Sequence, residues 1–180
     1  MNWLNPGGAV PVRVHAVADA LVAPEAKEGG LLDTAVVTVT YSNGAIAVAE
    51  ANFNALYGYD VRGGEVFGSA GMVTAGGPQA STAMSYTAAG INASTVRLNV
   101  DLFHDAYTAE LVHFVDSVKA DRDGVQAPAA QAAGGTDARN ALAVALAASR
   151  SAETGLPVDV ATIAEWRPAE PALHTVGDEA

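Results

Sequence analysis

The stretch DTAVVTVTYSNGAIAVAEANF, residues 33–53, decides the fold of this chain. Two runs rich in valine, threonine and alanine flank the pair Asn43-Gly44, which is the strongest short signal for a β-hairpin. In a two-residue turn of type I′ both central residues adopt positive φ angles, and Ser42 then pairs with Ala45. The stretch therefore predicts two antiparallel strands joined at Asn43-Gly44.

This register divides the side chains of the hairpin between two faces, because alternate residues of a strand point to opposite sides. A bulky face would carry Ala35, Val37, Val39, Tyr41, Ile46, Val48, Glu50 and Asn52. A small face without charge would carry Thr34, Val36, Thr38, Thr40, Ala47, Ala49, Ala51 and Phe53. We expect helices to cover the bulky face and a second subunit to cover the small face in a two-fold contact.

Segments on either side of the hairpin extend the sheet and add two helices. Residues 10–23 read as a first strand, residues 57–76 continue the meander, residues 78–95 form a loose hairpin and residues 158–160 an edge strand. The first helix, 104–119, has an apolar stripe of Tyr107, Leu111, Phe114, Val115 and Val118.

The second helix begins with Thr136 as N-cap and ends at Gly155, with a narrow stripe of Leu142, Ala145, Leu146 and Ser149. The predicted class is α+β: an open-faced, mainly antiparallel β-sheet with two principal helices packed on one face.

Composition bounds the function. The 180 residues are 50% hydrophobic and 16% charged, which indicates a globular chain with its own core. The net charge of -11, with lysines and arginines scattered, argues against nucleic acid and against an anionic membrane surface as partners. There is no cysteine, no apolar run near the ~20 residues that cross a bilayer, and no signal-peptide pattern at the start. We expect a cytoplasmic protein.

Motifs of catalysis are missing from the sequence. It contains no glycine-rich dinucleotide or P-loop motif, no H-E-x-x-H and no G-x-S-x-G. The histidines are too far apart for a short-range metal motif, and His15 and His113 are expected to be solvated. The sequence therefore predicts no catalytic residue and no metal site.

Two places remain as candidate binding sites. His104 begins a helix, and helix starts often line sites. The cluster 57–60, with Tyr57 and Tyr59, could supply phenolic hydrogen bonds to a polyol, although an aromatic pair that only pins a sheet is the common outcome.

Several short pieces follow one another in a recognisable order along the chain: residues 33–37, 42–45, 57–60, 65–69, 71–73 and 105–107 with Glu110 and Phe114, then Asp137, Ala141 and residues 155–158. In this order they resemble the C-terminal domain of the glucose-fructose oxidoreductase, inositol dehydrogenase and MocA family, and most of all its inositol 2-dehydrogenases. The likeness covers about residues 1–160. Leu102 and Ala138 depart from it, since relatives often have arginine and glycine there.

The resemblance implies an oxidoreductase of sugars and cyclitols in which an N-terminal Rossmann domain binds NAD or NADP and holds the catalytic lysine. The C-terminal domain shapes the substrate pocket and builds the oligomer. By this resemblance Tyr57, Tyr59 and Tyr107 lie near the substrate, and His104 joins them as a candidate contact. This chain would hold no cofactor site and would be catalytically silent alone.

Two interpretations stay open. In the first, residues 1–160 are the substrate-binding and oligomerisation domain of such an enzyme, residues 161–180 are a tail, and the chain forms a homodimer or homotetramer through the open sheet face. In the second, the chain is a stand-alone, non-catalytic module for oligomerisation or sugar binding.

Overall fold

The structure is a computed structural model that describes residues 5, 8–53, 63–77, 79–96, 98–125 and 133–165. The chain forms two compact units, and each is described by itself. The first unit combines Met1–Asn54 with Ala133–Ala180, and the second is Ala55–Ala132. Helices and antiparallel sheets in both units confirm the predicted α+β class.

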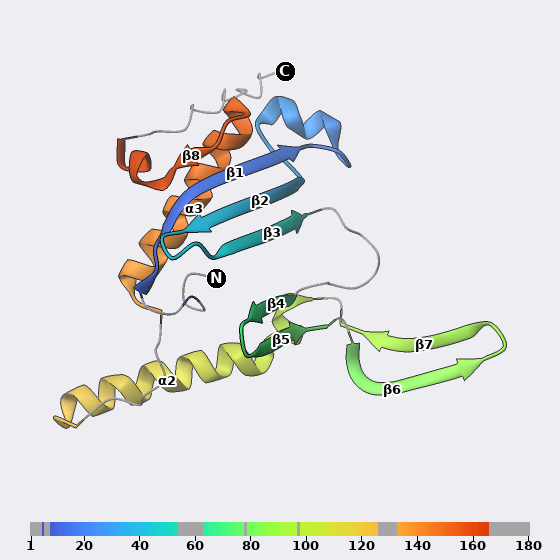
Figure 1. The fold of residues 1–180 in the computed structure, drawn as a ribbon. Helices are drawn as coiled ribbons and strands as arrows, with labels where there is room; N and C mark the ends of the chain where they lie inside the picture. Colours follow the sequence, from blue (N-terminus) through green and yellow to red (C-terminus); the bar gives the residue numbers. More distant parts are fainter. Residues whose placement is uncertain are drawn as a thin grey trace, which may run out of the picture. The chain divides into compact units, whose positions relative to one another are not determined.

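The first unit is a four-stranded antiparallel sheet in the order β3-β2-β1-β8, with α3 running across one of its faces (Figure 1). Its elements are β1 (Pro11–Asp19), η2 (Pro24–Gly29), β2 (Thr34–Tyr41), β3 (Ile46–Asn52), α3 (Gly135–Thr154), β8 (Val158–Asp159) and η3 (Val160–Glu165). The core between sheet and helix contains Val14, Val39, Tyr41, Ala147, Val158 and Ile163.

The β2–β3 loop differs from the predicted two-residue turn. The backbone N–H of Tyr41 donates to the carbonyl oxygen of Ala45 at 2.9 Å, so the loop has three residues. Gly44 has φ +83°. Among the described residues only glycines have a positive φ, so Asn43 has a negative one. This geometry is typical of a three-residue hairpin loop with glycine in the left-handed region, and it excludes a type I′ turn.

The longer loop shifts the register by one residue and exchanges the faces of β3. Val39 lies opposite Ala47, and Thr38 lies opposite Val48. The predicted division of β3 between the two faces is therefore wrong. The face under α3 combines Val37, Val39 and Tyr41 with Ala47 and Ala49, which are partly or fully buried.

The opposite face of this sheet, which we call the open face, carries charge and large apolar side chains. Strand β1 adds to it through its pairing with β2. The open face consists of Arg13, His15 and Val17 from β1, Thr40, Thr38 and Val36 from β2, and Ile46, Val48 and Glu50 from β3, all exposed. The prediction of an uncharged face of small residues is wrong, while the exposed position predicted for His15 is confirmed.

Helix α3 begins and ends at specific polar contacts. The N–H of Gly134 donates to Oδ2 of Asp137 at 2.8 Å, and the helix ends at Gly155 with φ +70°. Gly134, rather than the predicted Thr136, is thus the N-cap. The buried face of the helix contains Ala147 and Ser151, whereas Leu142, Ala145 and Ser149 of the predicted stripe are exposed. Leu146 of the predicted stripe packs partly buried against the core, so the buried side of the helix was predicted in part.

Ser151 joins three separate segments of the first unit. Its hydroxyl is fully buried, accepts a hydrogen bond from the N–H of Ala16 at 2.9 Å and donates one to the carbonyl oxygen of Leu156 at 2.7 Å. Strand β8 pairs with β1 only at Arg13 and Val14. Ser151 therefore satisfies a backbone donor of β1 beyond the end of β8.

Asp33 fixes the connection between β1 and β2. Its buried carboxylate accepts hydrogen bonds from the N–H groups of Leu21, Val22 and Ala23 at 2.8–3.0 Å and from the Thr34 hydroxyl at 2.8 Å. Burial by itself raises the pKa of Asp33, but these four donors outweigh burial and hold the pKa well below its ordinary value. Asp33 is thus an ionised anchor of the loop that precedes β2.

The described part of the second unit contains two hairpins and a long helix. Its elements are β4 (Gly63–Gly68), β5 (Gly71–Gly76), β6 (Gln79–Thr87), β7 (Gly90–Thr95), α1 (Asn99–Leu102) and α2 (His104–Arg122). In the described residues β4 pairs with β5 and β6 pairs with β7, so the predicted continuous meander over residues 33–76 is divided between two sheets. No helix of the described part of the chain is long and apolar enough to cross a membrane.

Candidate functional site

The described part of the predicted binding site lies where α1 leads into α2. His104 and Tyr107 are both in the first turn of α2. Tyr57 and Tyr59 lie outside the described residues, so their part of the prediction is not tested. The candidate site is therefore built outward from the start of α2.

Tyr107 is held by two neighbours from this region. Its hydroxyl accepts a hydrogen bond from Nδ2 of Asn99 at 3.3 Å. Its ring meets that of Phe103 edge to face, with ring centres 6.5 Å apart and planes at 82°. Such an arrangement is favourable for aromatic pairs. The phenol thus has a defined direction even though Tyr107 is 43% exposed.

His104 points its ring toward its own neighbour in sequence. Its Nδ1 lies 3.2 Å from Oδ1 of Asp105, and 76% of the His104 side chain is exposed. A protonated imidazole would form an ion pair with this carboxylate, and a neutral one could donate a hydrogen bond. The ring remains accessible to a ligand.

Phe103 connects Tyr107 to a hollow in the surface of the second unit. We call this hollow of about 520 Å³ the Phe103 hollow; it is lined by Gly76, Gly77, Gln79, Ser81, Thr82, Leu102 and Phe103. An amide and two hydroxyls come from the start of β6, and the apolar wall comes from α1 and its C-cap. The hollow is shallow and open to solvent, so it could contact one side of a small ligand.

Sequence reasoning missed the polar side of this hollow. Gln79, Ser81 and Thr82 belong to a strand rich in alanine, serine and threonine that matches no binding motif. Only the return of the chain from β7 into α1 brings Phe103 next to them. In the sequence, this region was indicated by His104, which begins α2 and directly follows Phe103.

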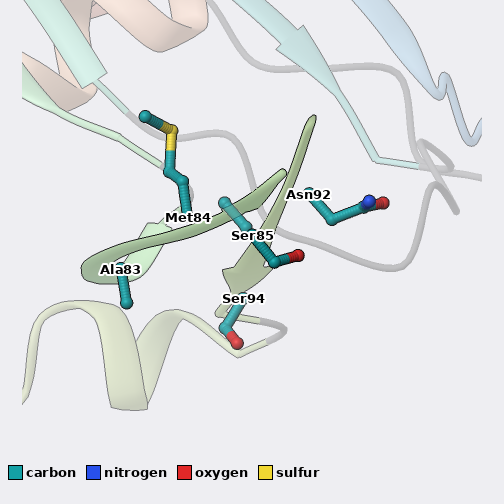
Figure 2. A pocket seen from close by; sticks show the side chains of 6 residues that line it. Ala83, Met84, Ser85, Asn92 and Ser94 are labelled. Carbon is teal, nitrogen blue, oxygen red and sulfur yellow. The ribbon is translucent and has the colours of Figure 1, made fainter. Parts of the chain in front are cut away.

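A second hollow of about 350 Å³ lies on the β6–β7 hairpin (Figure 2). It is lined by Ala83, Met84, Ser85, Asn92, Ala93 and Ser94. Figure 2 shows Ala83 and Met84 pointing to opposite sides of β6, as neighbours in a strand do. This hollow has no aromatic or charged wall and contains none of the predicted site residues.

His113, further along α2, differs from its prediction. It is partly buried, and its Nε2 atom is inaccessible to solvent without a hydrogen-bond partner in the described structure. The expectation of a solvated His113 is therefore wrong for this nitrogen.

The described residues do not fit the pyrophosphate of a dinucleotide. Such a group needs free backbone N–H groups at a helix start that follows a glycine-rich turn. At α3, which follows Gly134 and Gly135, the Asp137 carboxylate already accepts the N–H of Gly134 and would repel an anion. At α2 the first turn carries Asp105. Within the described ranges, no cluster of three or more metal-ligating side chains occurs either.

Comparisons with known proteins define the class. Residues 1–74 match a family model described as the GFO/IDH/MocA C-terminal domain. Over these residues the chain is similar to the C-terminal domain of this oxidoreductase family, as the sequence motifs indicated.

Two individual relatives show which members of the family the chain is similar to. The chain is 32% identical over 154 residues to the uncharacterized oxidoreductase YrbE of Bacillus subtilis, covering 85% of this chain and 43% of that protein. It is 33% identical over 141 residues to the myo-inositol 2-dehydrogenase of Thermotoga maritima, covering 78% and 40% respectively.

One solved structure adds the fold. The scyllo-inositol dehydrogenase of Lactobacillus casei, with bound NAD(H) and scyllo-inositol, superposes with a TM-score of 0.72 and 25% identity. The match covers 86% of this chain and 43% of that protein. The chain thus spans about two fifths of the length of the relatives it matches.

Proposed function

We propose that this chain is the substrate-binding and oligomerisation domain of an NAD- or NADP-dependent oxidoreductase that acts on a small polyol or cyclitol. The observation that carries the proposal is the Phe103 hollow, a polar and aromatic concavity in a domain of this family. Residues 1–160 would form the domain and residues 161–180 its tail. The cytoplasmic location expected from the sequence stays a prediction.

The chemistry of the hollow suits a ring that carries many hydroxyls. A cyclitol presents hydroxyls around its edge and C–H bonds on its faces. Gln79, Ser81 and Thr82 supply donors and acceptors for the edge, and the Phe103 ring supplies an apolar surface for a face. The Tyr107 hydroxyl, fixed by Asn99, is a further donor next to Phe103.

The role of these residues would be to bind and orient the substrate. Hydride transfer needs a nicotinamide and a placed acid or base, and both would come from a Rossmann domain, as the family resemblance implies. We therefore expect this chain alone to bind the polyol weakly and to leave NAD unreduced.

The substrate arm is tested by NMR titration of the full chain with myo-inositol and scyllo-inositol. We expect amide shifts at Gln79, Ser81, Thr82, Phe103 and Tyr107, and loss of these shifts in Gln79→Ala. The matched control is Ser85→Ala, which changes the hollow on the β6–β7 hairpin instead. Shifts centred on Ser85 and Asn92, or no shifts at millimolar ligand, would contradict the substrate assignment.

The cofactor arm is tested by calorimetric titration with NAD and NADH. We expect no binding, because the described helix starts offer no pyrophosphate cradle. Binding in the micromolar range would contradict the proposal.

The alternative is a stand-alone binding module. The encoding DNA upstream of Met1 separates the two: an in-frame strand, a G-x-G-x-x-G and a later lysine favour the enzyme domain. Their absence would favour the module.

The evidence for the proposed oligomerisation is the exposure of large apolar side chains on the open face. Val17, Ile46 and Val48 are 66%, 74% and 53% exposed there, which is an unusual exposure for large apolar side chains on one sheet face. A second copy of the chain would bury them, giving a homodimer or part of a homotetramer.

Val48→Arg should weaken the oligomer in sedimentation experiments, since it would bury a charge in the contact. Ala49→Arg is the matched contrast, because Ala49 lies on the α3 side and its replacement should destabilise the fold instead. A wild-type chain that stays monomeric would contradict this arm.

A further inference from the structure

The loop between β2 and β3 contains two residues that can react with each other. In an Asn-Gly pair the backbone nitrogen of the glycine can attack the side-chain carbonyl carbon of the asparagine, because glycine has no side chain that hinders a close approach. Asn43-Gly44 is the only such pair in the sequence, and both of its residues are exposed. Asparagine is accordingly counted among the thermolabile residues of proteins.

We propose that Asn43 is a deamidation site and that the folded β2–β3 loop holds the reaction back until the loop opens. In the first step the Gly44 nitrogen forms a bond to Cγ of Asn43, the bond from Cγ to Nδ2 breaks, and ammonia leaves with the proton of the Gly44 nitrogen. In the second step water opens the cyclic imide at one of its two carbonyl carbons. The product at position 43 is an aspartate or an isoaspartate, and no electrons are transferred.

Three hydrogen bonds restrain the reacting groups in the folded loop. The N–H of Gly44, the attacking group, donates to the carbonyl oxygen of Tyr41 at 2.9 Å. Oδ1 of Asn43 accepts from the N–H of Ala45 at 3.1 Å, and Nδ2 of Asn43 donates to Oδ1 of Asn5 at 2.8 Å. The reaction removes the proton from the Gly44 nitrogen, changes the geometry at Cγ and releases Nδ2, so each of the three bonds opposes it.

Residues that precede β1 hold the loop closed. Besides Asn5, Val10 contacts the loop twice: its N–H donates to Oγ of Ser42 at 3.1 Å, and its carbonyl oxygen accepts from the N–H of Ser42 at 2.9 Å. Exposed hydrogen bonds with few buried apolar contacts around them open most readily, and the side-chain bonds from Asn5 and Ser42 are exposed. The loop can therefore open while Tyr41 stays buried in the core.

The two products differ in what they do to the hairpin. An aspartate leaves the main chain unchanged and is itself common before glycine in hairpin loops. An isoaspartate routes the main chain through the side-chain carbon and lengthens the loop by one atom. The bonds that join Tyr41 to Gly44 and Ala45 then no longer match the length of the loop. Because these bonds fix the register of β3 against β2, conversion to isoaspartate weakens that pairing.

The test follows Asn43 by peptide mass spectrometry in the folded full chain and in the same chain unfolded in urea. We expect the folded chain to deamidate about tenfold or more slowly, because only the opened loop reacts. Asn92 is the internal control, since it is exposed on β7 but is followed by Ala93, whose Cβ hinders the attack. It should react slowly in both states.

Variants of the loop contacts identify what holds the loop closed. Asn5→Ala removes the partner of Nδ2, and Ser42→Ala removes the acceptor of the Val10 N–H. Loss of one such bond should raise the rate in the folded chain about two- to tenfold and leave the rate in urea unchanged. Ser149→Ala, which removes an exposed hydroxyl of α3, is the matched control and should change neither rate.

Each part of the proposal has an outcome that overturns it. An unreacted Asn43 in urea would exclude the site, and equal rates in folded and unfolded chains would exclude protection by the loop. If Asn5→Ala and Ser42→Ala react no faster than wild type, the residues before β1 do not hold the loop closed. Circular dichroism verifies that each variant folds.

The effect on the hairpin is measured separately by urea unfolding. The isoaspartate fraction of an aged sample should unfold at lower urea than wild type, whereas Asn43→Asp, which has the unaltered main chain, should unfold close to wild type. Equal destabilisation of the two would show that the added main-chain atom is not the cause.

Discussion

The two units of the chain differ in how they bury apolar side chains. In the first unit Val14, Val39 and Ala147 are at most 2% exposed between a sheet and a helix. In the described residues of the second unit Ala120 alone is buried. Its helix α2 has a regular apolar stripe, yet Leu111 and Phe114 are 67% and 64% exposed. An apolar pattern therefore gives a stable core only where a complementary surface lies against it.

The difference bears on stability. An isolated two-stranded hairpin is marginal in water, and the described part of the second unit contains two such hairpins. The first unit instead has a packed core between its sheet and α3. We expect substitutions in the first unit to determine the free energy of unfolding.

The largest effect is expected for Tyr41→Ala, which empties a core position that is 4% exposed. Loss of a buried aromatic ring costs about 3–5 kcal/mol. Phe114→Ala removes an aromatic ring of the second unit that is 64% exposed, and should change stability by about 0.5 kcal/mol or less. Urea unfolding followed by circular dichroism measures both. Equal losses would mean that α2 buries its stripe in solution.

The next effect is expected for Asp33→Asn. The folded pKa of Asp33 lies below the unfolded value of about 3.9, so the carboxylate stabilises the fold above that pH. The stabilisation is lost as the pH falls below about 4 toward the folded pKa. Wild type should therefore lose stability on acidification more steeply than Asp33→Asn.

Urea midpoints between pH 7 and pH 3 measure this difference in slope. Asp121→Asn, a change at an exposed carboxylate of α2 in the second unit, is the control and should keep the wild-type slope. An unchanged slope in Asp33→Asn would show that the anchor has no energetic role.

The smallest effect is expected for Ser151→Ala, which leaves the N–H of Ala16 buried without its acceptor. An unsatisfied buried donor costs about 1–3 kcal/mol. Ser149→Ala on the same helix removes an exposed hydroxyl and should have almost no effect. Thermal melts of the pair compare them directly, and a neutral Ser151→Ala would mean that water replaces the hydroxyl.

The sequence predicted elements better than it predicted pairings. Both long helices, the short β8 strand and the hairpin at Asn43-Gly44 are where the patterns placed them. The predicted pairing of β2 with β3 was wrong because Asn-Gly occurs both in two-residue turns and in three-residue hairpin loops. The backbone hydrogen bond from Tyr41 N–H to the carbonyl oxygen of Ala45 distinguishes the three-residue loop from the two-residue turn. One residue of slip then moved Ile46 and Val48 from the covered face to the open face.

The candidate site shows the same limit. His104 and Tyr107 could be proposed from a helix start and a family resemblance. Gln79 and Thr82 could not, because their relation to Phe103 is set by the path of the chain and not by spacing in sequence. Composition alone does not indicate which of many serines and threonines lines a hollow.

The first unit also has a consequence for the order of events during synthesis. Strands β1 to β3 of its sheet emerge from the ribosome before the second unit, whereas α3, which covers them, and β8 lie beyond the second unit in the sequence. At ~5–20 residues per second, the stretch from β3 to α3 takes roughly 4–17 s to be made. Throughout that interval Val14, Val39 and Tyr41 lack their cover, so the nascent sheet is a site for chaperone binding or misassembly.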